Sequence, residues 1–273
     1  PISSQLPDMP KGNMPYDSQY LLLDKSAKDE LVEQNPNASK YLKRIVGLGT
    51  KGIPTKIINY PADISMFKPE QEGLASLRKK LNLKKENFIF LGVGRLVYKK
   101  GFEYLIDAIS LLHIKYPNIR LIIGGDGDLM TELKEKVKNR LIDNKVLFVG
   151  NIDRKEISKY YNLSDVFVAP SIIDYRGNVD GGPVVSLESM ACGKPQILTN
   201  ILGMADVIKD GINGYVVPQK NPKALADAME KFIVSPKLGP GMGRKNVVLA
   251  RRTLSLDEIG KEYTEFFKKI LSK

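Results

Sequence analysis

The fold of this chain is decided by one stretch, Val166-Phe-Val-Ala-Pro-Ser-Ile-Ile-Asp-Tyr-Arg-Gly-Asn-Val-Asp180-Gly-Gly-Pro-Val-Val-Ser-Leu-Glu188-Ser-Met-Ala-Cys-Gly193. Its apolar start predicts a buried strand over 165–170, and a glycine-rich loop follows. Residues 184–191 then predict the first turns of a helix that presents Glu188. A strand whose glycine-rich turn opens a helix directs backbone N–H groups at a phosphate, so we expect an anion site where this helix begins.

The same alternation of strand and helix continues on both sides of this stretch. Residues 88–94 form a continuous apolar run, which is typical of a parallel strand covered on both faces. Repeated strand–helix units of this kind predict an α/β fold, a Rossmann-like doubly wound parallel sheet with right-handed crossovers. The expected strands are 88–94, 120–124, 146–150, 165–170, 195–199 and 214–217, and the expected helices are 101–116, 129–139, 154–163, 184–191, 222–233 and 256–270.

The two ends of the chain are less regular. Short strands are expected at 20–24 and 56–59, with a helix from Ser26 through Glu33 between them. A helical turn is expected at 205–209, and the tail after Gly243 is expected to be helical in two pieces.

The composition is that of a globular protein and excludes several other classes. The 273 residues are 42% apolar and 27% charged, as in a globular protein with an ample core. No apolar run approaches the roughly 20 residues that span a bilayer. The single cysteine, Cys192, and the single histidine, His113, exclude a disulfide framework and a His–Cys metal cluster within this chain. The low cysteine content favours a reducing, cytoplasmic location.

The net charge of +11 admits several kinds of anionic partner. Lysines are scattered among acids through most of the chain, which favours a solvated surface, and no aromatic–basic platform typical of single-strand binders is present. Residues 1–17 are polar and proline-rich, unlike a signal peptide. Residue 1 is proline, so we interpret the chain as a fragment or a processed product.

Cations follow the first regular strand. The run Gly92-Val-Gly-Arg95-Leu-Val-Tyr-Lys-Lys100-Gly101 places Arg95 and Lys100 at one strand end. Arginine offers a fork of donors that matches phosphate oxygens, lysine offers a point charge, and glycines allow close approach of the backbone. Ordinary surface cations on a loop are the alternative interpretation.

Two carboxylates flank the glycine-rich loop, Asp180 and Glu188, eight residues apart. A carboxylate beside a phosphate site is repelled by the phosphate, so its natural partner there is a sugar hydroxyl. The alternative is an acidic residue at a helix start together with an exposed Glu. The intervening Gly181-Gly-Pro183 favours a functional role, and nothing in the sequence indicates that the two acids act as an acid/base pair.

Three other features carry weaker signals. Gly124-Gly-Asp126-Gly127 lacks the full spacing of a dinucleotide fingerprint, so we expect a tight turn at a strand end. We expect His113 at the surface or boundary of its helix. Cys192 is expected to be a small buried side chain.

Taken together, these residues resemble the C-terminal, donor-binding domain of GT-B glycosyltransferases of family 4 (group 1), which are retaining enzymes that use nucleotide sugars. The resemblance also includes Val149-Gly150, Ala191-Cys-Gly-Lys-Pro195, Asp210-Gly-Ile-Asn-Gly214 and the tail with Tyr263. It implies that Arg95 and Lys100 contact the donor diphosphate, Asp180 the sugar and Glu188 the ribose. The implied catalytic residues are Arg95, Lys100 and Asp180, and the implied donor-binding residues are Gly94, Gly182, Pro183, Val184, Val185 and Glu188.

The sequence departs from this family in three ways. Asp180 stands where the family has Glu, and Asn59-Tyr-Pro-Ala62 stands where it usually has Asn-Gly. Most of the family's acceptor-binding N-terminal domain, with its histidine, is missing, and His113 lies in the wrong domain to replace it. We therefore expect a remnant of that domain with a linker over 1–59, a nucleotide-sugar-binding domain over 60–250, and a C-terminal helix over 251–273 that packs back toward the N-terminal domain.

The resemblance implies transfer of a sugar from a nucleotide diphosphate sugar to an acceptor hydroxyl, in glycan or glycolipid synthesis. The donor is a substrate with an unspecified base, and no cofactor, metal ion or nucleic-acid partner is expected. A glycan or lipid-linked acceptor and peripheral contact with the cytoplasmic face of a membrane are also expected by family analogy. Two alternatives stay open, a non-catalytic nucleotide-sugar-binding module and a GT-B epimerase or phosphorylase.

Overall fold

Six parallel strands form the expected sheet. The computed structural model describes residues 20–22, 55–175, 177–178, 184–201 and 207–272. The strands are β3 (Phe88–Val93), β4 (Ile119–Gly124), β5 (Val146–Gly150), β6 (Val166–Ala169), β7 (Gln196–Thr199) and β8 (Gly214–Val217). Each lies within two residues of its predicted bounds, so the prediction of a Rossmann-like α/β sheet is confirmed.

The strands are ordered β5-β4-β3-β6-β7-β8 across the sheet. The chain therefore moves outward from β3 through β4 to β5, returns to place β6 on the other side of β3, and moves outward again. This order reverses between β3 and β6, where Phe90 pairs with Val166 and Leu91 with Phe167. In open α/β sheets ligands bind beyond the carboxyl ends of the strands at such a switch point.

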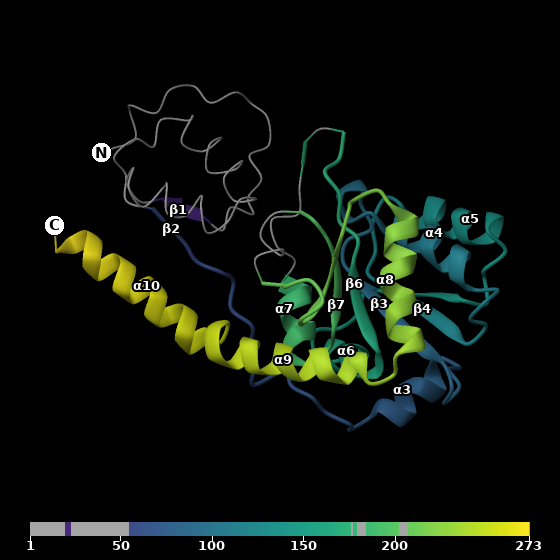
Figure 1. Ribbon diagram of the computed structural model, residues 1–273, viewed down its shortest axis with the longest axis horizontal. Coiled ribbons are helices and arrows are strands. Elements are labelled where there is room, and N and C mark those ends of the chain that lie inside the picture. The colour runs from purple at the N-terminus through teal and green to yellow at the C-terminus, as the bar shows by residue number, and fades with distance from the viewer. Residues whose placement is uncertain (1–19, 23–54, 176, 179–183, 202–206, 273) are drawn as a thin grey trace.

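Side chains alternate between the two faces of the sheet. Phe90 joins one buried cluster, whereas Ile89 and Leu91 join the other, and all three are fully buried. Because successive strand residues point to opposite faces, a strand apolar throughout needs cover on both. Helices α4 (Phe102–Leu112), α5 (Met130–Asn139) and α8 (Pro222–Val234) pack on the first face, and α3 (Leu74–Lys80), α6 (Ile157–Leu163) and α7 (Val184–Ala191) on the second (Figure 1).

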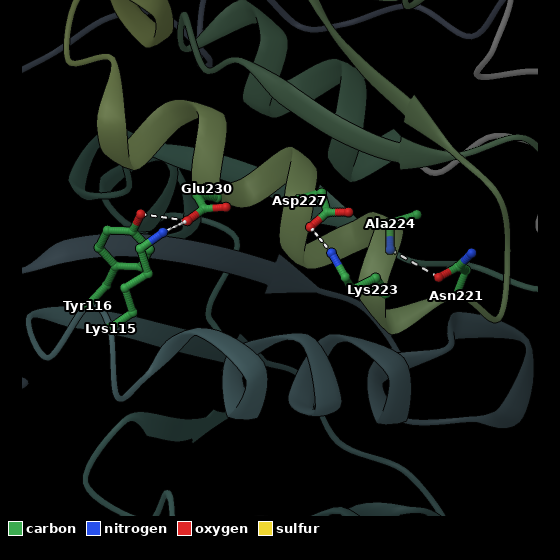
Figure 2. Close-up of polar contacts among 7 residues, drawn as sticks. All are labelled: Lys115, Tyr116, Asn221, Lys223, Ala224, Asp227 and Glu230. Atoms are coloured by element: carbon green, nitrogen blue, oxygen red, sulfur yellow. Dashed lines mark hydrogen bonds and ion pairs between the residues drawn. The ribbon is translucent and has the colours of Figure 1, made fainter.

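Helix α8 shows how local sequence fixes an element on the sheet. The Asn221 side chain accepts a hydrogen bond from Ala224 N at 3.0 Å, and Pro222 occupies the first turn, where its missing N–H costs nothing. Near the far end of α8, Glu230 accepts hydrogen bonds from Lys115 Nζ at 2.7 Å and Tyr116 Oη at 2.6 Å (Figure 2). The first contact caps the start of α8, and the other two tie its far end to the segment that follows α4.

Helix α9 (Leu238–Thr253) corrects the sequence analysis, which placed the helical tail after Gly243. Its first turn contains Gly239, Pro240 and Gly241, which are poor helix formers. A proline is tolerated in a first turn because the N–H groups there have no intrahelical acceptor. Helix α9 crosses the ends of the sheet where the strands begin and continues into α10 (Leu256–Leu271), which is capped by the Ser255 hydroxyl (Figure 1).

Two glycines set how closely α9 approaches the rest of the domain. A Cβ atom built on Gly243 would lie 2.0 Å from the carbonyl oxygen of Gly193, the residue that ends the turn after α7. No side chain fits between these two backbones. Gly193 itself has a φ of 76°, in the left-handed region that favours glycine.

The segments before the sheet are only partly described. Strands β1 (Tyr20–Leu22) and β2 (Thr55–Ile57) pair antiparallel, and Ala62 N donates to Leu254 O at 2.6 Å, which ties the segment before β3 to the end of α9. The expected helix from Ser26 lies outside the described residues, as do residues 205–206 of the helical turn expected at 205–209. Residues 207–209 are described, and they form a turn and irregular chain rather than a helix. Helix α3 was not predicted. The domain boundaries at 59 and 250 stay predictions.

Candidate functional site

The loop after β3 carries the two predicted cations to the switch point. Gly94 follows β3, Arg95 is exposed, and a short 3-10 helix, η1 (Tyr98–Lys100), ends the loop. The Lys100 side chain folds back over Gly94, since a Cβ built on Gly94 would meet Lys100 Cε at 3.4 Å. The structure thus places Gly94, Arg95 and Lys100 together beyond the end of β3.

Backbone hydrogen bonds hold this loop against its neighbours. Leu96 is fully buried, and its N–H donates to Asp126 O at 2.9 Å in the loop after β4. Gly125 N donates to Gly150 O at 2.7 Å, and a Cβ on Gly125 would lie 2.0 Å from Gly94 O. The run Gly124–Gly127 is therefore the tight strand-end turn that the sequence analysis expected, and three loops meet through their backbones.

The loop after β6 is tied to the same place. Ile172 N donates to Lys99 O at 2.8 Å, and a Cβ on Gly101 would lie 2.1 Å from Pro170 O. Gly101 has a φ of 64°, so a side chain there would be strained as well as blocked. The two loops on either side of the switch point therefore form one unit.

The rest of the predicted site is described only in part. Asp180, Gly182 and Pro183 lie outside the described residues. Val184 begins α7 and is exposed, and Val185 is half-buried. The first backbone N–H groups of an α-helix have no intrahelical acceptor, so the start of α7 offers donors and a positive dipole end at this position.

Glu188 lies one turn into α7, on the face that packs against α6. Its side chain is only 4% exposed, and each oxygen has a partner. Arg154 Nη1 donates to Oε1 at 3.0 Å, and the Tyr161 hydroxyl donates to Oε2 at 2.8 Å. A buried carboxylate is stable only when it is paired and hydrogen-bonded in this way.

The two partners of Glu188 differ in exposure. Tyr161 is fully buried, and burial first, then the nearby Glu188 charge, hold its pKa well above the usual range, so the hydroxyl stays a proton donor. The Arg154 side chain is 66% exposed and lies 5.5 Å from the centre of the Phe67 ring. Sequence reasoning missed both residues, although Tyr161 lies in a predicted helix and Arg154 at its start.

Replacing Tyr161 with phenylalanine is expected to destabilise the protein by about 1.5–3 kcal/mol, because the buried Glu188 carboxylate loses a donor. Tyr160→Phe is the matched control, since none of the described hydrogen bonds involves the Tyr160 hydroxyl. Urea unfolding of both variants measures the difference. Equal loss of stability in the two variants would show that the Tyr161–Glu188 bond contributes little.

The remaining candidates have structural roles. The imidazole Nδ1 of His113 lies 2.9 Å from Ser110 O at the end of α4, and the ring is half-buried. Cys192 is buried, and burial raises the pKa of its thiol to about 11.

Within the described part of the chain, no group of three or more His, Cys, Asp or Glu residues is arranged to hold a metal ion. None of the described helices is both long enough and apolar enough to cross a membrane.

Family comparison gives one match that covers most of the chain. The model for glycosyl transferases group 1 matches residues 75–246, well over half of the sequence. A second model, the MmeI target recognition domain, matches residues 1–50, under a fifth of the chain and almost all of it outside the described residues.

Individual relatives agree with the first match. An uncharacterised glycosyltransferase of Methanocaldococcus jannaschii is 32% identical over 162 residues, which are 59% of this chain and 40% of that protein. Sucrose-phosphate synthase from Thermosynechococcus elongatus has a similar fold, with a TM-score of 0.73 at 24% identity over 87% of this chain and 57% of that one. Anabaena HepE, solved with UDP-glucose, has a TM-score of 0.70 at 22% identity over 78% of this chain and 57% of that one. The chain spans about half or less of the length of the curated relatives it matches.

Proposed function

The chain belongs to the glycosyl transferases group 1 family, with a GT-B type Rossmann-like domain, and from that premise we propose that it is the donor-binding portion of a retaining glycosyltransferase. The proposed reaction transfers a sugar from a nucleotide diphosphate sugar to an acceptor hydroxyl. One observation carries the proposal. Arg95 and Lys100 lie together at the switch point between β3 and β6, on a loop bonded to the segment that leads to α7.

The chemistry we propose is electrostatic stabilisation of the leaving group. When the bond between the sugar and the diphosphate breaks, negative charge develops on the diphosphate. Arg95, Lys100 and the first N–H groups of α7, at Val184 and Val185, would donate hydrogen bonds to that charge as it develops. Gly94, and by family resemblance Gly182 and Pro183, would let the backbone approach the phosphates.

We assign the two carboxylates to the nucleoside and the sugar. Glu188 would accept a hydrogen bond from a ribose hydroxyl, because a carboxylate has about four acceptor sites and the described residues use two of them. The ribose would approach from the side of the exposed Arg154, since Tyr161 is fully buried. Asp180 would contact the donor sugar. The nucleotide sugar is a substrate, and we assign the chain no resident cofactor.

The proposal for the acceptor and the remaining partners rests on the family resemblance, because the chain spans about half or less of the curated relatives it matches. A complete GT-B enzyme closes two Rossmann-like domains over its donor, and this chain contributes one of them. We propose that the acceptor, a glycan or a lipid-linked sugar, is bound by a second domain. Peripheral contact with a membrane surface is part of this proposal.

Titration calorimetry of this chain with UDP, GDP and ADP tests the donor site. We expect one of the three to bind, because Arg95 and Lys100 lie together at the switch point. UDP is tested first because the Anabaena relative was solved with UDP-glucose. An absence of heat with all three nucleotides at millimolar concentration, from protein shown to be folded by circular dichroism, would refute the donor-site proposal.

A further inference from the structure

A cavity lies along α9, apart from the switch point. Its volume is about 740 Å³, within the range of small-molecule sites. One wall is α9, from Arg244 to Thr253, and the other is the connection between β7 and β8, from Val207 to Asn213. We call this cavity the α9 groove. None of the described residues proposed to bind the donor lines it.

The α9 groove has cations on both walls. Lys209, Arg244, Lys245 and Arg252 line it, and all four are exposed. No Asp or Glu is among the described residues that line it, and no described residue forms a hydrogen bond or ion pair with any of these four side chains. Four like charges around one cavity repel one another, so an anion that enters is attracted by all of them.

The floor of the groove is apolar. Leu254 and Val207 are buried there, and Ile212 and Val248 are about half exposed, at 49% and 50%. A free phosphate or a nucleic-acid backbone would bury none of the apolar surface of these exposed aliphatic side chains. An anion that carries apolar groups would bury it, and that burial favours binding.

The two walls are held together by a buried pair of asparagines. Asn213 Nδ2 donates to Asn246 Oδ1 at 2.9 Å, and Asn246 Nδ2 donates back to Asn213 O at 2.9 Å. Both side chains are buried, and Asn246 also donates to Lys194 O at 2.8 Å. The groove is therefore a preformed cavity between fixed walls.

We propose that the α9 groove binds the phosphate headgroup of an anionic lipid and seats this domain on an anionic membrane surface. The cations would contact the phosphate, and Ile212 and Val248 would lie against the glycerol and the first methylene groups. The site deepens the membrane contact named under the proposed function. It does not depend on donor binding, because none of the groove residues contributes to the switch point.

Flotation with lipid vesicles tests this proposal. The 273-residue chain is mixed with vesicles of phosphatidylcholine alone or of phosphatidylcholine with phosphatidylglycerol. We expect binding only to the anionic vesicles. The double variant Arg244→Gln/Lys245→Gln should bind them about 25-fold more weakly, at roughly fivefold per basic residue near the surface. Val248→Ser, which leaves the charge unchanged, should also weaken binding, by roughly threefold.

A charge-matched control separates the groove from the overall positive charge. Lys79→Gln/Lys80→Gln removes two exposed cations from α3, neither of which lines the groove, and should leave vesicle binding within about twofold of the unchanged chain. Equal losses in the two double variants, or an unchanged affinity for Val248→Ser, would overturn the proposal. So would failure to bind anionic vesicles, or binding of inorganic phosphate or duplex DNA through Arg244 and Lys245 without vesicle binding. Calorimetry with UDP, GDP and ADP on the same variants keeps this outcome distinct from failure of the donor site.

Discussion

Arg95→Ala and Lys100→Ala are each expected to weaken binding of the preferred nucleoside diphosphate by about tenfold or more. A hydrogen bond from a charged group contributes about 1.5–3 kcal/mol, and one is lost in each variant. The double variant is expected to lose at least about 100-fold if the two contacts are independent. Titration calorimetry measures all three affinities, and thermal unfolding checks that the variants are folded.

A control variant distinguishes direct contact with the diphosphate from attraction of the nucleotide by the positive charge of the whole protein. Lys138→Ala removes one exposed cation from α5, and it should leave the affinity within about twofold because solvent and salt screen distant charges. If Lys138→Ala weakened binding as much as Arg95→Ala, the two predicted residues would act only through net charge. The assignment of Arg95 and Lys100 to the diphosphate would then be wrong.

Gly243→Ala is expected to destabilise the protein by about 3 kcal/mol or more, although alanine is the better helix former. The new Cβ would lie 2.0 Å from Gly193 O, and the obstructing atom belongs to the backbone, so it cannot swing away. Helix α9 would have to move away from α7. We therefore expect a loss of stability at the upper end of the range for overpacked cores. Urea unfolding at equilibrium measures the change in the free energy of unfolding.

Gly241→Ala is the matched control in the same helix. A Cβ on Gly241 meets nothing within 4 Å, so only the helix propensity changes. That change should stabilise the protein by about 0.5–1 kcal/mol. Two glycines separated by one residue are thus expected to respond with opposite signs. A stabilising effect at both positions would show that α9 is not held against Gly193 in solution.

The sheet could be predicted from the sequence because its signals are local. A run such as Phe88-Ile-Phe-Leu-Gly-Val93 is apolar at every position, and this requires a strand buried on both faces. The start of α9 could not be predicted in the same way. Gly239 and Pro240 oppose a helix locally, and packing against the ends of the strands overrides that preference.

The residues of the candidate site also differ in whether a local sequence signal predicts them. Arg95 and Lys100 follow a recognisable strand end, so the sequence predicts them, and the strand order brings their loop to the switch point. Arg154 carries no such signal, because its ion pair with Glu188 joins residues 34 positions apart. That contact exists only because α6 and α7 lie side by side on one face of the sheet, and a single sequence does not specify this pairing.

The strand order also has a consequence for how the chain folds. Strands β3, β4 and β5 follow one another and can pair as they are synthesised, whereas β6, the partner on the other side of β3, begins only at Val166. Until that strand is made, β3 is a sheet edge with unpaired backbone groups, and such an edge invites pairing with another chain. A nascent or truncated product that ends before Val166 would therefore be prone to aggregate. Strands β7 and β8 can join the sheet only after the late, long-range pairing of β6 with β3.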